Sequence, residues 1–248
     1  MSKFKKILVV PDSHVEPGQS NVRAEWLGRM LEEEEPTHLV HIGDIAEMGS
    51  MSFYDPIKST AYTRDCEAVH DFLYKFKKAA GSAYDDVQKV FLEGNHEARI
   101  RRRVIESPEL KEAIDLKGLG VYEYFDKVVE WRGGPGVYNL AGIMFSHYVQ
   151  NRMGRAIGGV NHARSLLLET MQSTVVGHSH ALNYHSKALP NGRHIHGLVS
   201  GCFFEHEHEW AGQNSGKYWR GVAVLHDVRQ GEYDLELISM HRMKKRYG

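Results

Sequence analysis

The order of strand and helix signals along the chain predicts an α/β protein in which helices cover a β-sheet. Three short apolar runs, at residues 6–11, 38–42 and 87–92, are typical of buried strands. Segments with apolar residues at helical spacing lie between them, at residues 21–35 and 64–80. This alternation favours a layered fold of sheet and helices.

The second half of the chain is richer in strand signals. Five candidate strands lie at residues 142–146, 174–177, 194–198, 221–227 and 233–239. One helix is expected within residues 152–170, ending in the run of leucines at 166–168. Because no linker-like stretch divides the chain, we expect residues 1–248 to form a single domain.

The composition excludes several classes of protein. Hydrophobic residues make up 42% of the 248 residues, which is too many for a disordered chain, and no uncharged apolar run is long enough to cross a membrane. The 31 basic and 32 acidic residues give a net charge of -1, so there is no general electrostatic case for nucleic-acid binding. With two cysteines and no signal-peptide pattern, we expect a cytoplasmic protein.

Polar side chains follow five of the expected strands, at the point where each strand ends. In α/β sheets, ligands bind beyond the carboxyl ends of the strands. The residues concerned are Asp12, His14, Asp44, Asn95, His147, His178 and His180. Seven oxygen and imidazole donors exceed the needs of one tetrahedral zinc ion, and suit two adjacent divalent metals that share a carboxylate. Imidazole-rich sites favour zinc, iron, manganese or nickel over magnesium.

The series D-x-H, G-D, G-N-H-E, H and G-H-x-H, between Asp12 and His180, resembles the calcineurin-like metallophosphoesterase superfamily, including its phage-encoded and bacterial members. The motifs occur in the order found in that family and span about two thirds of the chain. The resemblance implies a layered β-sandwich flanked by helices, in the order α-β-β-α.

The resemblance also implies a role for each residue. The implied ligands are Asp12, His14 and His180 for the first metal, Asn95, His147 and His178 for the second, and Asp44 as the bridge. A bridging hydroxide would attack phosphorus, and His96 would stand beside the phosphate as the general acid. We expect two divalent ions, manganese first, with iron, zinc or nickel as alternatives.

The substrate class rests on a departure from one family pattern. Ser/Thr phosphatases of the superfamily carry G-D-x-x-D-R-G, whereas Glu47 and Met48 occupy the last Asp and Arg positions here. This favours a phosphodiesterase acting on nucleotides or nucleic acid, with Arg99 as a candidate phosphate-binding residue. The alternatives are a phosphomonoesterase acting on a small molecule or a protein and, third, a non-catalytic scaffold. The complete set of ligand motifs argues against the scaffold.

Other features receive simpler interpretations. The H-x-H pairs at residues 194–196 and 206–208 lack the G-H-x-H context, so we expect them to be surface strand residues. The aromatic segment 203–220 is either a lid, a substrate-specificity segment or part of the core. The sequence leaves the oligomeric state open.

Overall fold

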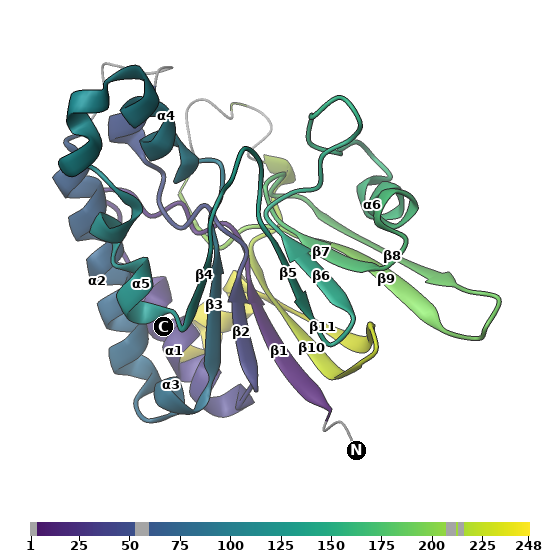
Figure 1. The fold of residues 1–248 in the computed structure, drawn as a ribbon. Coiled ribbons are helices and arrows are strands. Elements are labelled where there is room, and N and C mark those ends of the chain that lie inside the picture. Colours follow the sequence, from purple (N-terminus) through teal and green to yellow (C-terminus); the bar gives the residue numbers. More distant parts are fainter. Residues whose placement is uncertain (1–3, 53–59, 207–211, 213–215) are drawn as a thin grey trace.

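Two β-sheets pack face to face, and helices cover their outer faces (Figure 1). The structure is a computed structural model that describes residues 4–52, 60–206, 212 and 216–248. The layers follow the order helix, sheet, sheet, helix, which confirms the predicted α/β sandwich. Within the described residues, no helix combines the length and the apolar character needed to span a membrane.

The first sheet has parallel strands at its centre. Its order is β11 (Glu232–Ser239), β10 (Gly221–Arg229), β1 (Lys5–Val10), β2 (His38–His41), β3 (Gln88–Leu92) and β4 (Lys127–Val129). Strands β1 to β4 run parallel, whereas β10 is antiparallel to both of its neighbours. The parallel arrangement brings the carboxyl ends of β1, β2 and β3 to one edge of the sheet.

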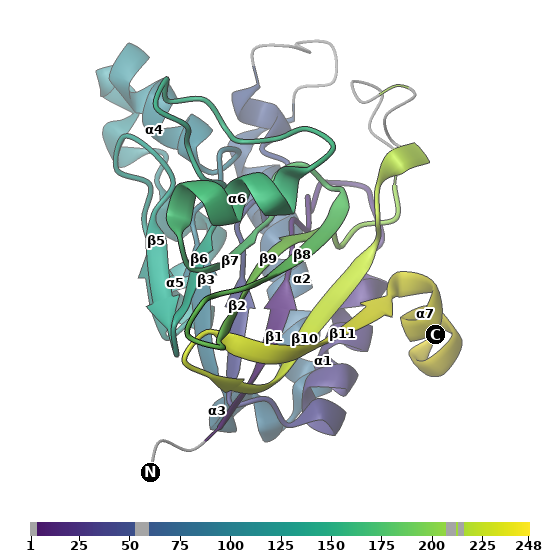
Figure 2. The same cartoon turned by 90° about the vertical axis from the view of Figure 1, so that its right-hand side faces the viewer.

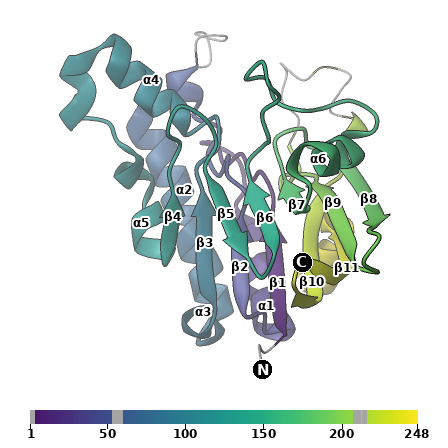
Figure 3. The same ribbon diagram turned by 45° about the vertical axis from the view of Figure 1, so that its right-hand side comes forward.

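The second sheet is mixed. Its order is β5 (Val137–Leu140), β6 (Ile143–Ser146), β7 (Ser173–Val176), β9 (His194–Ser200) and β8 (Leu182–Ala188). Strands β6, β7 and β9 run parallel, and the hairpins β5–β6 and β8–β9 are antiparallel. The ends of β6 and β7 lie at the same upper edge as helix α4 (Figure 3).

The helices lie on both sides of the paired sheets. They are α1 (Val22–Glu34), α2 (Tyr62–Ala80), α3 (Ala83–Asp86), α4 (Ala98–Glu106), α5 (Val121–Tyr124), α6 (His162–Thr170) and α7 (Met240–Tyr247). Short 3₁₀ turns are η1 (Gly49–Met51), η3 (Pro108–Glu112) and η4 (Leu116–Leu119). Helix α6 lies across the outer face of the second sheet (Figure 2), whereas α1 and α2 cover the first sheet.

Strand β1 shows how the sequence builds the two cores. Successive side chains of a strand point to opposite faces. Leu8 and Val10 accordingly pack in the cluster shared with α1 and α2, whereas Ile7 and Val9 pack in the cluster between the two sheets. All four side chains are fully buried, which explains why the strand is a continuous apolar run and not an alternating pattern.

The helix expected within residues 152–170 is α6, and the loop before it contains Gly154 and Gly159 with positive φ angles of 75° and 96°. One sequence prediction requires correction. His196 is buried, with its Nδ1 2.7 Å from the Tyr184 hydroxyl, and is not a surface residue; His194 is exposed as expected. His208 lies outside the described residues.

Candidate metal centre

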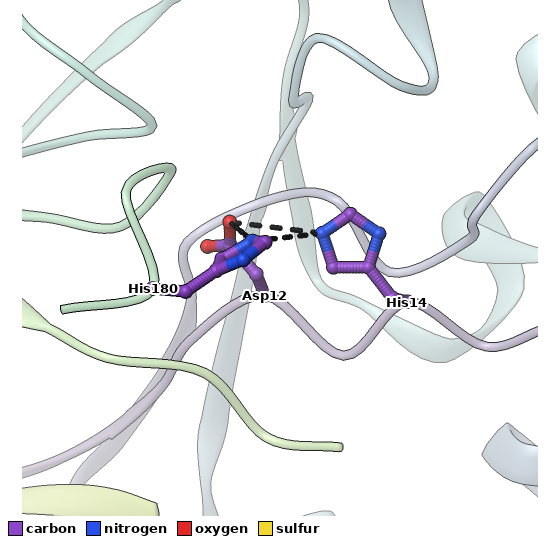
Figure 4. Close-up of side chains that lie close together, drawn as sticks. All are labelled: Asp12, His14 and His180. Carbon is purple, nitrogen blue, oxygen red and sulfur yellow. Dashed lines mark hydrogen bonds and ion pairs between the residues drawn. The ribbon is translucent and has the colours of Figure 1, made fainter. Parts of the chain in front are cut away.

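One group of converging side chains joins the loops that follow β1 and β7. Nε2 of His180 lies 3.2 Å from Asp12 Oδ2 and 3.0 Å from Nε2 of His14, as Figure 4 shows. His14 Nε2 is 4.0 Å from the same carboxylate oxygen. The three side chains are buried, so their polar atoms need partners other than bulk water. The Asp12 carboxylate also accepts from the backbone N–H of His178 at 3.0–3.1 Å.

A second group joins the loops that follow β2, β3, β6 and β7. His147 Nε2 lies 2.8 Å from Asn95 Oδ1 and 3.3 Å from Asp44 Oδ2. His178 offers a ring nitrogen within 4.8 Å of the ligand atoms of Asp44 and His147. The structure therefore brings together the residues that the resemblance assigned to the second metal.

Asp44 connects the two groups. Its Oδ2 atom lies 3.3 Å from His147 Nε2 in the second group and 3.8 Å from His14 Nε2 in the first. The Asp44 side chain is almost fully buried, and its other oxygen accepts a hydrogen bond from the backbone N–H of His96 at 2.8 Å. One carboxylate oxygen thus faces both groups, as a bridging ligand requires.

Hydrogen bonds at Nδ1 fix the ring orientation of His147 and His14. His147 Nδ1 donates to the carbonyl of Ile42 at 2.9 Å, and His14 Nδ1 donates to Glu47 Oε2 at 2.5 Å. In both rings this leaves the Nε2 lone pair directed at the centre. Histidines that ligate metals show the same arrangement, since a bond at one nitrogen sets the orientation and basicity of the other.

The chemistry of the donors fits a cation. His147 Nε2 faces two acceptor oxygens, Asn95 Oδ1 and Asp44 Oδ2. Because Nε2 presents a lone pair when the ring is neutral, these three atoms share no hydrogen unless a proton is added. Although burial opposes both shifts, His147 holds the pKa of Asp44 well below its usual range, and Asp44 with Asp12 raises the pKa of His147 to about 9. A divalent ion would satisfy the same lone pairs in place of the proton.

Four of these residues have unusual backbone geometry. His14, Asp44, His178 and His180 have positive φ angles of 39°, 47°, 68° and 57°. Non-glycine residues seldom adopt this region, and such positions concentrate at functional sites. The ligands therefore lie on tight turns immediately after the strands.

Backbone packing beneath the centre explains two motif residues. A Cβ on Gly94 would lie 2.1 Å from Asp44 Oδ1 and 2.3 Å from the Asp44 nitrogen, so only glycine fits there. The buried Glu97 carboxylate accepts hydrogen bonds from the backbone N–H groups of Asp44, Ala46 and Gly94 at 2.9–3.0 Å. Glu97 thus ties together the loops that carry Asp44 and Asn95.

His96 and Arg99 lie at the edge of the centre. His96 Nε2 is 3.9 Å from Asp44 Oδ2 and accepts from Arg99 Nη2 at 3.0 Å, while its Nδ1 donates to the Glu47 carbonyl at 2.7 Å. Arg99 Nη1 donates to the same carbonyl at 2.8 Å. Burial lowers the pKa of His96 to about 4.

Two described residues of the aromatic segment 203–220, Phe204 and Tyr218, lie beside the first group. Phe204 is fully buried, with its ring centroid 5.2 Å from that of His14 and 5.3 Å from that of His180. Tyr218 lies edge-on to His180 at 4.7 Å. Phe204 therefore belongs to the core, whereas Trp210 lies outside the described residues.

Sequence reasoning missed two supporting residues. Glu47 was noted as a departure from a phosphatase motif, and its contact with His14 was not anticipated. Glu97 was noted only as the last letter of G-N-H-E. In the sequence, Glu47 and Glu97 are marked only by lying within a few residues of an expected ligand. The folded structure is needed to show which groups their carboxylates bind.

One family profile matches most of the sequence. The sequence profile of the calcineurin-like phosphoesterases matches residues 5–209. The chain belongs to the calcineurin-like phosphoesterase family. No curated protein sequence matches this phosphoesterase.

Solved structures similar to this phosphoesterase share little sequence with it. A Vps29 single mutant from Entamoeba histolytica is 14% identical, with a TM-score of 0.41 and coverage of 94% of this chain and 98% of that chain. A conserved uncharacterized protein from Streptococcus pneumoniae, described as a predicted phosphoesterase, is 11% identical, with a TM-score of 0.37 and coverage of 96% and 100%. A Thermus thermophilus protein is 10% identical, with a TM-score of 0.40 and coverage of 95% and 99%.

Proposed function

We propose that this phosphoesterase hydrolyses phosphate esters at a centre of two divalent metal ions, and that its substrates are phosphodiesters of nucleotides or nucleic acid. The observation that carries the two-metal proposal is Asp44 Oδ2, which faces both His14 Nε2 and His147 Nε2 at 3.8 and 3.3 Å. A shared carboxylate oxygen between two groups of imidazole and oxygen donors suits a pair of ions, with manganese as the first candidate.

The proposed ligands are those implied by the motifs. The first ion would be held by Asp12, His14 and His180, the second by Asn95, His147 and His178, and both by Asp44. When bound, such ions supply positive charge for the phosphate and an activated water as nucleophile. Glu47 and the Ile42 carbonyl orient two of the ligand rings, which keeps the ligand atoms in place before substrate arrives.

His96 and Arg99 are proposed to act on the phosphate. Arg99 donates to His96 Nε2, the atom from which His96 would deliver a proton to the leaving oxygen. While Nε2 accepts from Arg99 it carries no proton, so proton delivery requires the Arg99 guanidinium to turn away and His96 Nε2 to take up a proton from solvent first. A phosphate oxygen is the natural new partner for Arg99. In this scheme Arg99 binds the phosphate and His96 is the general acid.

The choice of diester over monoester rests on Glu47 and Met48. Met48 is fully buried at the position where the phosphatase motif has arginine, so no cation is available there to bind a phosphate dianion. Arg99 favours the alternative of a phosphomonoesterase, because one guanidinium at the edge of the centre suits a more highly charged group. Hydrolysis of bis-nitrophenyl phosphate compared with mono-nitrophenyl phosphate separates the two.

The test uses metal-stripped protein reloaded with manganese, with His96→Ala, Arg99→Gln and the exposed control His194→Ala. We expect faster diester hydrolysis, a loss of about 10²–10⁴-fold for His96→Ala, and wild-type rates for His194→Ala. Arg99→Gln should raise KM more than it lowers kcat if it binds the ground-state phosphate. Faster monoester hydrolysis would favour the phosphatase, and no hydrolysis with two metals bound would contradict the proposed enzyme.

A further inference from the structure

We propose that Trp131, Tyr148 and Arg102 form a subsite that stacks the base of a nucleotide whose phosphate lies at the metal centre. This inference rests on the proposed function and deepens it, because it names a nucleoside phosphate as the substrate class. It places the base on the side of the second ligand group, which contains Asp44, Asn95, His147 and His178.

The rings of Tyr148 and Trp131 are connected to the metal centre by the contact between Tyr148 and the proposed ligand His178. Tyr148 follows His147 directly, and its ring centroid lies 4.7 Å from that of His178, with the planes inclined by 41°. Trp131, in the loop after β4, lies 5.6 Å from Tyr148 at 68°. The rings of His178, Tyr148 and Trp131 therefore contact one another in series, and Trp131 stands one ring away from the ligand.

A cation lies near these rings. Arg102, on α4, donates to the backbone carbonyl of Asn95 at 2.9 Å, and its side chain is exposed. Asn95 in turn contacts His147, the residue that precedes Tyr148, through its side-chain oxygen at 2.8 Å. A guanidinium and two partly exposed rings next to a phosphate-binding centre suit a ligand with both a planar π system and negative charge.

The opposite side of the centre offers less free ring surface. There Phe204 is fully buried against His14 and His180. The partly buried Tyr218 already has the Arg220 guanidinium over its ring, 5.9 Å from the ring centroid. Trp131 and Tyr148 are only partly buried and retain surface for a ligand. The base is therefore assigned to the side of Tyr148.

The proposal can be tested by binding, with three probes that differ only in what is attached to the phosphate. Adenosine 5′-monophosphate, ribose 5-phosphate and inorganic phosphate are titrated by equilibrium dialysis against the manganese-loaded protein. Stacking predicts that the nucleotide binds about 5- to 150-fold more tightly than ribose 5-phosphate, equivalent to about 1–3 kcal/mol.

The variants distinguish a stacking platform from simple packing against His178. Tyr148→Leu and Trp131→Leu should remove most of the preference for the nucleotide over ribose 5-phosphate, whereas Tyr148→Phe should keep it. Tyr218→Leu, a matched loss of an aromatic ring on the other side, should also keep it. Metal content is measured for each variant, and if Tyr148→Leu loses metal, Trp131→Leu decides because Trp131 contacts Tyr148 and stands one ring further from the ligands.

Two results would overturn the subsite. One is a wild-type protein that binds both sugar phosphates equally, and the other is a nucleotide preference that survives Trp131→Leu and Tyr148→Leu. If bis-nitrophenyl phosphate is still hydrolysed in either case, the subsite fails and the proposed function stands. A nucleotide preference lost in both leucine variants, in a protein that hydrolyses neither model ester, would support the subsite and contradict the enzyme.

Discussion

Glu47 offers a direct test of how the metal centre is held in shape. Its carboxylate accepts the Nδ1 hydrogen of His14 at 2.5 Å, which directs the other ring nitrogen at Asp12 and His180. Glu47→Ala removes the acceptor entirely. Glu47→Gln keeps a neutral oxygen that can accept the same hydrogen bond.

The expected size of the effect follows from this single contact. A hydrogen bond to a charged group contributes about 1.5–3 kcal/mol, which corresponds to about 10- to 150-fold in an equilibrium constant. Loss of such a supporting partner typically weakens metal binding by about 10- to 100-fold. We therefore expect Glu47→Ala to weaken binding of the ion at the first group by about 10- to 100-fold, and Glu47→Gln by about tenfold or less.

The measurement is manganese affinity by competition with a coloured chelator. The second ion should be affected less, because the Glu47 carboxylate bonds to His14 of the first group and lies 3.5 Å from His96 Nδ1, which is not a proposed metal ligand. Glu16→Gln is the matched control, since it removes a carboxylate near the centre whose closest described ion-pair partner is His206 at 3.7 Å. The role of Glu47 would be refuted if Glu47→Ala bound manganese within twofold of wild type, or if Glu16→Gln lost as much manganese affinity as Glu47→Ala.

Two further predictions concern stability. Burial lowers the pKa of His41 to about 3, so the unfolded chain binds the extra proton between pH 6.5 and 3 and wild-type stability falls as the pH drops through that window. Between pH 7 and 5, His41 should lower the free energy of unfolding of the wild type by about 2 kcal/mol. His41→Gln should therefore show a smaller pH dependence in urea unfolding. Equal losses of stability in the variant and the wild type would contradict this. Gly94→Ala should lower the free energy of unfolding by about 1–3 kcal/mol and weaken manganese binding, because the new Cβ would displace Asp44. In the control Gly158→Ala, a Cβ would meet nothing within 4 Å, so stability and manganese affinity should both stay unchanged. Wild-type manganese affinity in Gly94→Ala would count against the geometry.

The fold and the ligand groups could be predicted because they depend on strong local patterns. Strands buried on both faces are continuous apolar runs, and the parallel arrangement brings Asp12, Asp44 and Asn95 to one edge. Strand β8 escaped prediction because its side chains alternate between partly buried and exposed positions and it carries polar residues such as Lys187. Strands β4 and β5 are short and partly exposed, so they lack the apolar run that identified their neighbours.

The bounds of α6 and the burial of His196 have physical causes of the same kind. The leucines at 166–168 identify the helix within residues 152–170, and the glycine-containing loop before α6 sets where it begins. His196 alternates with an exposed His194, and nothing in the sequence shows that Tyr184 on the neighbouring strand covers one of them. Contacts between strands distant in sequence are not recorded in local spacing.

The motif G-N-H-E illustrates how four adjacent residues have four separate physical roles. Gly94 leaves room for Asp44, and Asn95 directs its oxygen at His147. His96 lies at the edge with Arg99, and Glu97 points inward to three backbone N–H groups. Because the hydrogen bonds of the Glu97 carboxylate go to backbone N–H groups of both loops, its part is to hold the two loops in register. Proton transfer is assigned to His96, so loss of Glu97 should act on the geometry of the whole centre and not on one chemical step.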